Sequence, residues 1–213
     1  MLNGTADSPT ALEYTRTGNT TGSSLSFAHD AAARDWWLAS TFLFNAWIGL
    51  HVGVPYLFLW GAPESRSPLA LVAQSFNLGL LLGRHQLPSA TTSSQTASDH
   101  LQALNEHSDC HPLIGYASEI YAIAVRSLSV GPRVNRLFKA VVTTAEALTP
   151  AMRARIERAF GCHVWNRYGS RAVGDIASES THQRGLHVNP LFTYLEVADA
   201  AGRPLPHAPK ASC

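Results

Sequence analysis

The second half of the sequence alternates short apolar stretches with helical segments of about ten residues. Strands are predicted over 113–116, 138–144 and 164–168, and helices over 120–128 and 151–160. Parallel strands need a crossover segment between them, and a helix of this length provides one. The alternation therefore predicts an α/β fold, with a layered, mostly parallel sheet and flanking helices.

The remaining elements are predicted from local signals. Residues 1–26 are rich in Thr, Ser and Gly without an apolar period and are interpreted as a loop. Asp30 is a candidate N-cap for a helix over 31–47, whose apolar residues occupy more than one face, so most of it is expected to be buried. The prediction is completed by a buried strand over 54–60, helices over 69–82 and 99–107, a strand over 191–197 and a turn over 199–203.

Two apolar runs make a small membrane protein one alternative. Residues 36–63 contain no Asp, Glu, Lys or Arg, and residues 67–83 form a second charge-free run. A run above ~18 residues is long enough to span a bilayer. Asn45, His51 and Pro55 argue against spanning, because they divide the first run into a helix-like and a strand-like half. No secretory signal is visible, and no membrane partner is expected.

Composition limits the partners and the compartment. The 16 Lys and Arg residues balance 15 Asp and Glu residues, giving a formal net charge of +1. Without a global field to attract nucleic acid, no nucleic-acid partner is expected, and any bound polyanion must be small. The three cysteines, Cys110, Cys162 and Cys213, are far apart and form no CxxC pair. Reduced thiols in the cytoplasm are therefore expected.

A glycine- and hydroxyl-rich segment is the first candidate for ligand binding. It contains Thr17, Gly18, Thr20, Thr21 and Gly22. Glycines let the backbone approach a ligand closely, and hydroxyls donate hydrogen bonds to phosphate oxygens. The segment is therefore a candidate phosphate cradle, although clusters of this composition are more often plain solvated loops. No Gly-Lys-Ser/Thr follows it, so it is not a Walker P-loop.

Polar side chains also lie where two predicted strands end. Thr144 and Glu146 lie at the end of one strand, and Tyr168, Gly169 and Ser170 at the end of the next. Ligands in open α/β sheets bind at the carboxyl ends of the strands. These residues are therefore expected at one ligand-binding edge, although each alone is equally consistent with a surface cap or a packing residue.

Seven short motifs follow the order found in one enzyme family. They occupy residues 17–23, 59–61, 114–118, 143–150, 160–162, 166–171 and 185–189, and the motif at 166–171 is the most specific. Over roughly residues 15–206 the chain resembles the phenylacetate–CoA ligase-like and capsule-biosynthesis-like branch of the adenylate-forming (AMP-binding) enzymes. The resemblance implies a large N-terminal domain that binds ATP and a carboxylic acid, forms an acyl-adenylate and pyrophosphate, and passes the acyl group to CoA or another thiol.

The resemblance also implies a role for each matching residue. Thr17, Gly18, Thr20, Thr21 and Gly22 match the loop that holds the ATP phosphates, Thr144, Glu146 and Ala147 match the segment beside adenine, and Tyr168, followed by Gly169, matches the aromatic residue packed against the adenine ring. Ser170 matches the hydroxyl near the α-phosphate, so Ser170 and Glu146 are the candidate catalytic residues. Tyr116 and Ala117 match positions in the acid pocket, without identifying the acid.

Two departures from the family's pattern bear on activity. Ala172 stands where the family has a glutamate that helps to hold Mg²⁺. Asp175, three residues on, would share a face with Ala172 if this stretch is helical, and Glu179 is another candidate metal ligand. The sequence stops at Cys213, before the family's ribose-binding aspartate and its small C-terminal domain. Residues 1–213 are therefore interpreted as a truncated N-terminal domain, with disordered tails at 1–14 and 207–213.

A third departure raises a zinc hypothesis. Ser180 stands where many relatives have Cys, and some of those relatives bind zinc. His182 and His187, with Glu179 and Cys162 in the neighbourhood, form a weak candidate ligand set. The function expected from all these features is an acyl-CoA ligase-like activity impaired by the truncation and by Ala172. The main alternative is a non-catalytic nucleotide- or acyl-binding remnant that needs a partner chain, and exposed sheet edges would favour self-association.

Overall fold

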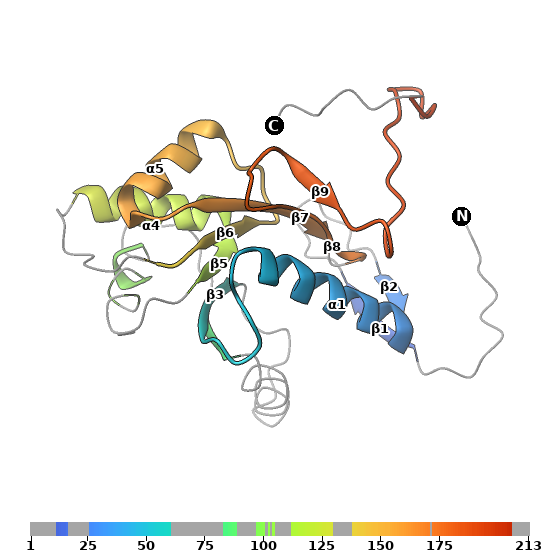
Figure 1. Cartoon of the computed structure of the whole chain (residues 1–213), viewed down its shortest axis with the longest axis horizontal. Coiled ribbons are helices and arrows are strands. Elements are labelled where there is room, and N and C mark those ends of the chain that lie inside the picture. The colour runs from blue at the N-terminus through green and yellow to red at the C-terminus, as the bar shows by residue number, and fades with distance from the viewer. Residues whose placement is uncertain are drawn as a thin grey trace.

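The computed structural model describes residues 12–16, 26–60, 83–88, 97–100, 102, 104, 112–129, 138–170 and 172–205. Its centre is a seven-stranded sheet with the strand order β4-β3-β5-β6-β7-β8-β9 (Figure 1). The strands are β3 (Tyr56–Trp60), β4 (Arg84–Pro88), β5 (Leu113–Tyr116), β6 (Val141–Thr144), β7 (Val164–Ser170), β8 (Gly174–Glu179) and β9 (Leu186–Val188).

The sheet is mostly parallel, as predicted. Strands β4, β3, β5, β6 and β7 pair in parallel with their neighbours. Strand β8 pairs antiparallel with β7, because a short turn joins them directly, and β9 pairs antiparallel with β8. The predicted α/β fold with flanking helices is therefore confirmed.

Alternate residues of the central strands face two separate cores. Leu113, Val141 and Val164 pack with helices α4 (Ala117–Ser129) and α5 (Pro150–Phe160) on one face. Their sequence neighbours Ile114, Val142 and Trp165 form a second cluster on the opposite face, as the period of two in a strand requires. Helix α1 (Ala31–Trp47) contacts β8, and Figure 1 shows it lying apart from α4 and α5.

Helices α1 and α5 begin at capping residues, one of them the predicted Asp30. Asp30 Oδ1 accepts a hydrogen bond from the Ala33 N–H at 2.7 Å at the start of α1. Thr149 Oγ1 does the same for the Met152 N–H at the start of α5, at 3.2 Å. Gly161 ends α5 in the left-handed conformation at φ 68°. These local signals explain why both helices were predicted at nearly their observed bounds.

Helix α1 differs from the prediction in its burial. Of its 17 residues only Ser40, Phe44 and Asn45 are buried, while Trp36 is 48% exposed. The charge-free run over 36–63 divides as predicted, between α1 and strand β3. Within the described part of the chain, no helix is long and apolar enough to cross a membrane. The predicted helix over 69–82 lies outside the described residues.

Several strands were not predicted. Strands β1 (Glu13–Arg16) and β2 (Ser26–His29) form an antiparallel pair where a loop was expected. Strands β4, β8 and β9 also lack a sequence-based prediction, and the strand predicted over 191–197 is not formed. The turn over 199–203 is confirmed by the hydrogen bond from the Gly202 N–H to the Asp199 carbonyl. Residues 97–100, 102 and 104 are helical, so the predicted helix over 99–107 begins earlier than expected.

Candidate functional site

Three adjacent parallel strands end at the edge where the candidate residues lie. Tyr116 of β5 is paired with Thr144 of β6, and Thr143 of β6 with Asn166 of β7. Strand β7 continues to Ser170, so its last residues extend beyond the end of β6. Thr144, Glu146, Ala147, Tyr168, Gly169 and Ser170 therefore lie at one carboxyl edge of the sheet. Such an edge is where open α/β sheets bind ligands.

Glu146 connects the bend after β6 to the first turn of α4. Its Oε2 accepts a hydrogen bond from the Ser118 backbone N–H at 2.7 Å. Ala145, between Thr144 and Glu146, has a φ of 66°, a left-handed conformation that is uncommon outside glycine. Thr144 is buried, whereas Glu146 and Ala147 are exposed. The bend thus presents a carboxylate at the surface and holds it in place.

The turn from β7 to β8 presents the second group of candidates. The Tyr168 side chain is 52% exposed. A Cβ added to Gly169 would lie 2.6 Å from the Gly174 carbonyl oxygen, so the close approach of the two strands requires glycine. Ser170 Oγ accepts a hydrogen bond from the Val173 N–H at 3.2 Å, and its own proton remains available as a donor.

Aromatic rings line the opposite end of this edge. Trp60, the last residue of β3, stacks on Tyr116, the last residue of β5, with ring centroids 4.5 Å apart. Phe58 stacks on the other side of Trp60 at 5.2 Å. Tyr116 is half-buried and Ala117 is fully buried. Tyr116 and Ala117, the candidates for an acid pocket, thus lie at a flat, apolar stack of rings.

The candidate phosphate cradle, Thr17 to Gly22, lies outside the described residues. The residues on either side of it are described: Arg16, the last residue of β1, is paired with Ser26, the first residue of β2. The second strand leads directly into α1 through Asp30. The role of this segment in phosphate binding stays a prediction.

The two candidate magnesium ligands have protein partners and face opposite ways. Asp175 Oδ2 accepts a hydrogen bond from Thr41 Oγ1 at 2.7 Å and forms an ion pair with Arg167 Nη1 at 3.3 Å. Glu179 receives two hydrogen bonds from Arg153 Nη2 of α5, at 2.8 and 2.9 Å. Asp175 therefore faces α1, and Glu179 faces α5 across the sheet.

This arrangement does not fit a shared Mg²⁺ site. Asp175 and Glu179 lie in a strand, whereas the prediction that Asp175 shares a face with Ala172 depended on a helix. A bulge in β8 inserts one residue between the pairs Tyr168–Ala177 and Gly169–Asp175 and so reverses the direction of the side chains beyond it. Within the described ranges, no group of three or more His, Cys, Asp or Glu side chains could hold a metal ion.

Most of the candidate zinc ligands are likewise engaged with other groups or partly buried. His187 Nε2 lies 3.0 Å from Ser180 Oγ, and its ring packs edge-on against Trp47. Burial, reinforced by the charge of Glu157, raises the pKa of the Cys162 thiol to about 12. In the part of the chain that the structure describes, these residues form no group of three or more side chains that could hold a metal ion.

A buried polar cluster under the turn was missed from the sequence. Arg167 is only 4% exposed, donates a hydrogen bond from Nη2 to Asn45 Oδ1 at 2.8 Å, and lies over the Phe44 ring. Burial lowers its pKa, and the nearby Asp175 carboxylate acts in the opposite direction. The available signal was an arginine two residues after the apolar Trp165 in a predicted strand, which places both side chains on the same inward face.

No family model and no curated protein matches the sequence. Among solved structures, the chain is similar to a 2-hydroxyisobutyryl-CoA ligase in complex with 2-HIB-AMP and CoA, with 18% identity over 92% of this chain and 45% of that one and a TM-score of 0.59. It is also similar to a benzoate–CoA ligase from Burkholderia xenovorans LB400 (18% identity, 86% of this chain, 36% of that one, TM-score 0.61).

A third similar structure is an anthranilate–CoA ligase in complex with anthranoyl-AMP (16% identity, 92% of this chain, 36% of that one, TM-score 0.57). The chain thus spans between 36% and 45% of the length of these three ligases. At these identities the likeness concerns the fold. The chain therefore has an α/β fold similar to part of the fold of these three CoA ligases.

Proposed function

We propose that the chain binds ATP and a carboxylic acid at the carboxyl edge of its sheet and forms an acyl-adenylate. One observation carries the proposal: the bend after β6 and the turn after β7 place Glu146, Tyr168 and Ser170 at one edge of a sheet shared with ligases. One of those ligases was solved with anthranoyl-AMP and another with 2-HIB-AMP and CoA. The more specific phenylacetate–CoA ligase-like assignment and a cytoplasmic location are part of the proposal.

In the proposed reaction the residues of the chain position the reactants and form no covalent bond with them. A carboxylate oxygen forms a bond to the α-phosphorus of ATP while the bond from that phosphorus to the pyrophosphate oxygen breaks, and pyrophosphate leaves. In this scheme the half-exposed Tyr168 ring stacks on adenine, and the Ser170 hydroxyl donates to an α-phosphate oxygen. Glu146 holds the bend beside adenine through its hydrogen bond to Ser118.

The acid would lie near the stacked rings of Trp60 and Tyr116. Their parallel planes, at an interplanar angle of 11°, offer a flat apolar surface to an aromatic or apolar acyl group. CoA or another thiol is the proposed acceptor in a second step. The exposed side chains of Leu191 and Tyr194 support the additional proposal of self-association.

A non-catalytic nucleotide-binding role is the second candidate. It is favoured by the partners of Asp175 and Glu179, since neither carboxylate is placed to replace the glutamate that the family has at Ala172. No step of the proposed reaction is therefore assigned to a metal held by these residues. Ala172→Glu should strengthen binding of Mg²⁺ with ATP if the motif alignment is right, and an unchanged magnesium dependence would count against it.

Calorimetric titration with ATP, with and without Mg²⁺, tests the proposal. Tyr168→Ala should weaken binding by about 5- to 150-fold, because stacking on a base contributes ~1–3 kcal/mol. Tyr168→Phe is the matched control and should bind as the original chain does, since it keeps the ring. A folded chain that binds no ATP would refute the proposed function.

Pyrophosphate release then separates the two candidate functions. Release that depends on an added aromatic or aliphatic carboxylic acid, and that Ser170→Ala reduces, supports adenylation. Saturable ATP binding without release for any acid in the panel supports the non-catalytic role.

A further inference from the structure

We propose that helix α1 positions the end of β7 and the turn that follows it, where the candidate nucleotide-binding residues lie. It does so through a polar bridge made of Thr41, Asp175, Arg167 and Asn45. This inference rests on the proposed function, because it assigns to α1 the placement of Tyr168 and Ser170. These four side chains are positioning residues, since each acts on a ligand only through the turn.

The bridge links helix α1, strand β8 and strand β7 by three hydrogen bonds. Asp175 of β8 accepts hydrogen bonds at the same oxygen, Oδ2, from Thr41 of α1 at 2.7 Å and from Arg167 of β7 at 3.3 Å. Arg167 returns to α1 through its 2.8 Å hydrogen bond to Asn45. Thr41 and Asn45 are four residues apart and so lie on one face of the helix. Moving α1 would therefore break contacts with both strands of the hairpin.

The bridge meets the hairpin beside the candidate nucleotide-binding residues. Asp175 is paired with Gly169, which lies between Tyr168 and Ser170. The bulge in β8 is what directs Asp175 toward α1, and bulges commonly redirect a side chain next to an active site. The helix also packs on the end of the turn: a Cβ added to Gly174 would lie 2.3 Å from the Trp37 ring.

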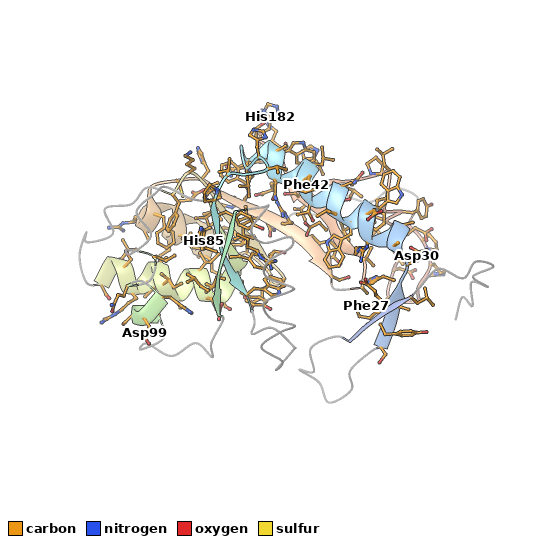
Figure 2. All side chains as sticks on the ribbon, turned by 90° about the horizontal axis from the view of Figure 1, so that it is seen from below. Phe27, Asp30, Phe42, His85, Asp99 and His182 are labelled. Carbon is orange, nitrogen blue, oxygen red and sulfur yellow. The ribbon has the colours of Figure 1, made fainter. Side chains whose placement is uncertain are left out.

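Helix α1 also continues toward the pair formed by β1 and β2. Figure 2 shows the helix running from Phe42 to its N-cap, Asp30, with Phe27 of β2 below that end of the helix in this view. The ring of His29, in β2, lies 6.2 Å from the Trp37 ring. Trp37 of α1 therefore lies against the end of the turn and also near β2, the strand that leads into α1.

The opposite face of the hairpin provides a contrast. Arg153 and Glu179 join α5 to β8, and Glu179 also accepts a hydrogen bond from the Asn166 N–H at 2.8 Å. This contact is made near the start of β7, away from the turn. The α5 contact should therefore contribute to stability without positioning Tyr168 and Ser170.

Thr41→Val tests the bridge with the smallest change, because it removes a hydroxyl and keeps the shape. Ser40→Ala is the matched control: Ser40 is also buried in α1, but its hydroxyl accepts from Asn189 and does not touch the hairpin turn. Thr41→Ser restores the hydroxyl. The two readouts are the ATP dissociation constant by calorimetry and amide hydrogen exchange at residues 168–170.

Thr41→Val should weaken ATP binding about tenfold and speed exchange at 168–170 by a similar factor, the loss expected for a hydrogen bond to a charged group. Ser40→Ala and Thr41→Ser should change both readouts less than about twofold. Equal losses in Thr41→Val and Ser40→Ala, or unchanged exchange at 168–170, would overturn the bridge. An original chain that binds no ATP would instead refute the proposed function, and this inference would fall with it.

Discussion

The bridge makes a quantitative prediction for the substitution Arg167→Met. The Arg167–Asp175 distance of 3.3 Å gives an attraction of about 5 kcal/mol at an effective dielectric constant of ~20. Desolvation of both groups offsets much of this, because Arg167 is only 4% exposed. Removing the arginine alone leaves the Asp175 carboxylate without its cation and Asn45 without its donor. We therefore expect the free energy of unfolding to fall by ~3–5 kcal/mol.

An exposed ion pair is the control for this prediction. Arg34 and Glu13 lie closer together, at 2.6 Å, but their side chains are 55% and 67% exposed. Exposed pairs contribute ~0–1 kcal/mol, so Arg34→Met should cost no more than about 1 kcal/mol. Urea unfolding followed by tryptophan fluorescence measures both variants. Equal losses in the two variants would refute the reasoning that burial, not distance, decides the contribution.

Three further predictions concern single residues. Gly169→Ala should lower the free energy of unfolding by ~1–3 kcal/mol in urea, because its Cβ would lie 2.6 Å from the Gly174 carbonyl oxygen. Thr149→Ala should cost ~1 kcal/mol in the same assay, since the Met152 N–H loses its cap. Cys162, with a pKa of about 12, should react with iodoacetamide far more slowly at pH 8 in the folded chain than in urea, measured in a variant without the other cysteines. Because the unfolded thiol ionises above about pH 8.5 while the folded one keeps its proton, stability should fall between pH 8.5 and 12.

Elements whose signals are local were predicted well. The Thr149-Pro150 start and the Gly161 stop define α5 within one residue, because caps act through neighbouring backbone groups. Strands β5 and β6 were found because each is a short stretch between turn residues that begins with two consecutive apolar residues. The carboxyl edge followed from this order, since the ends of adjacent parallel strands must meet.

Elements that depend on a distant partner were missed. Strand β4 is polar, with Arg84, His85 and Gln86, and is a strand because it pairs with β3 at the edge of the sheet. The pair of β1 and β2 likewise forms across a segment without an apolar period. Burial of α1 was overestimated because its aromatic residues exceed what one sheet face can cover, so Trp36 remains exposed.

The positions of Asp175 and Glu179 show why residue spacing was insufficient at the site. Four residues apart, they would share a face about one turn apart in a regular helix, whereas a regular strand would already separate them by about 13 Å along one face. The bulge in β8 also turns Asp175 to the face opposite Glu179, and a bulge arises from the pairing with β7 rather than from a pattern within β8. As a result, Asp175 contacts α1 and pairs with Arg167, whereas Glu179 contacts α5 and pairs with Arg153. Two residues predicted as metal ligands thus anchor the hairpin to a helix on each face.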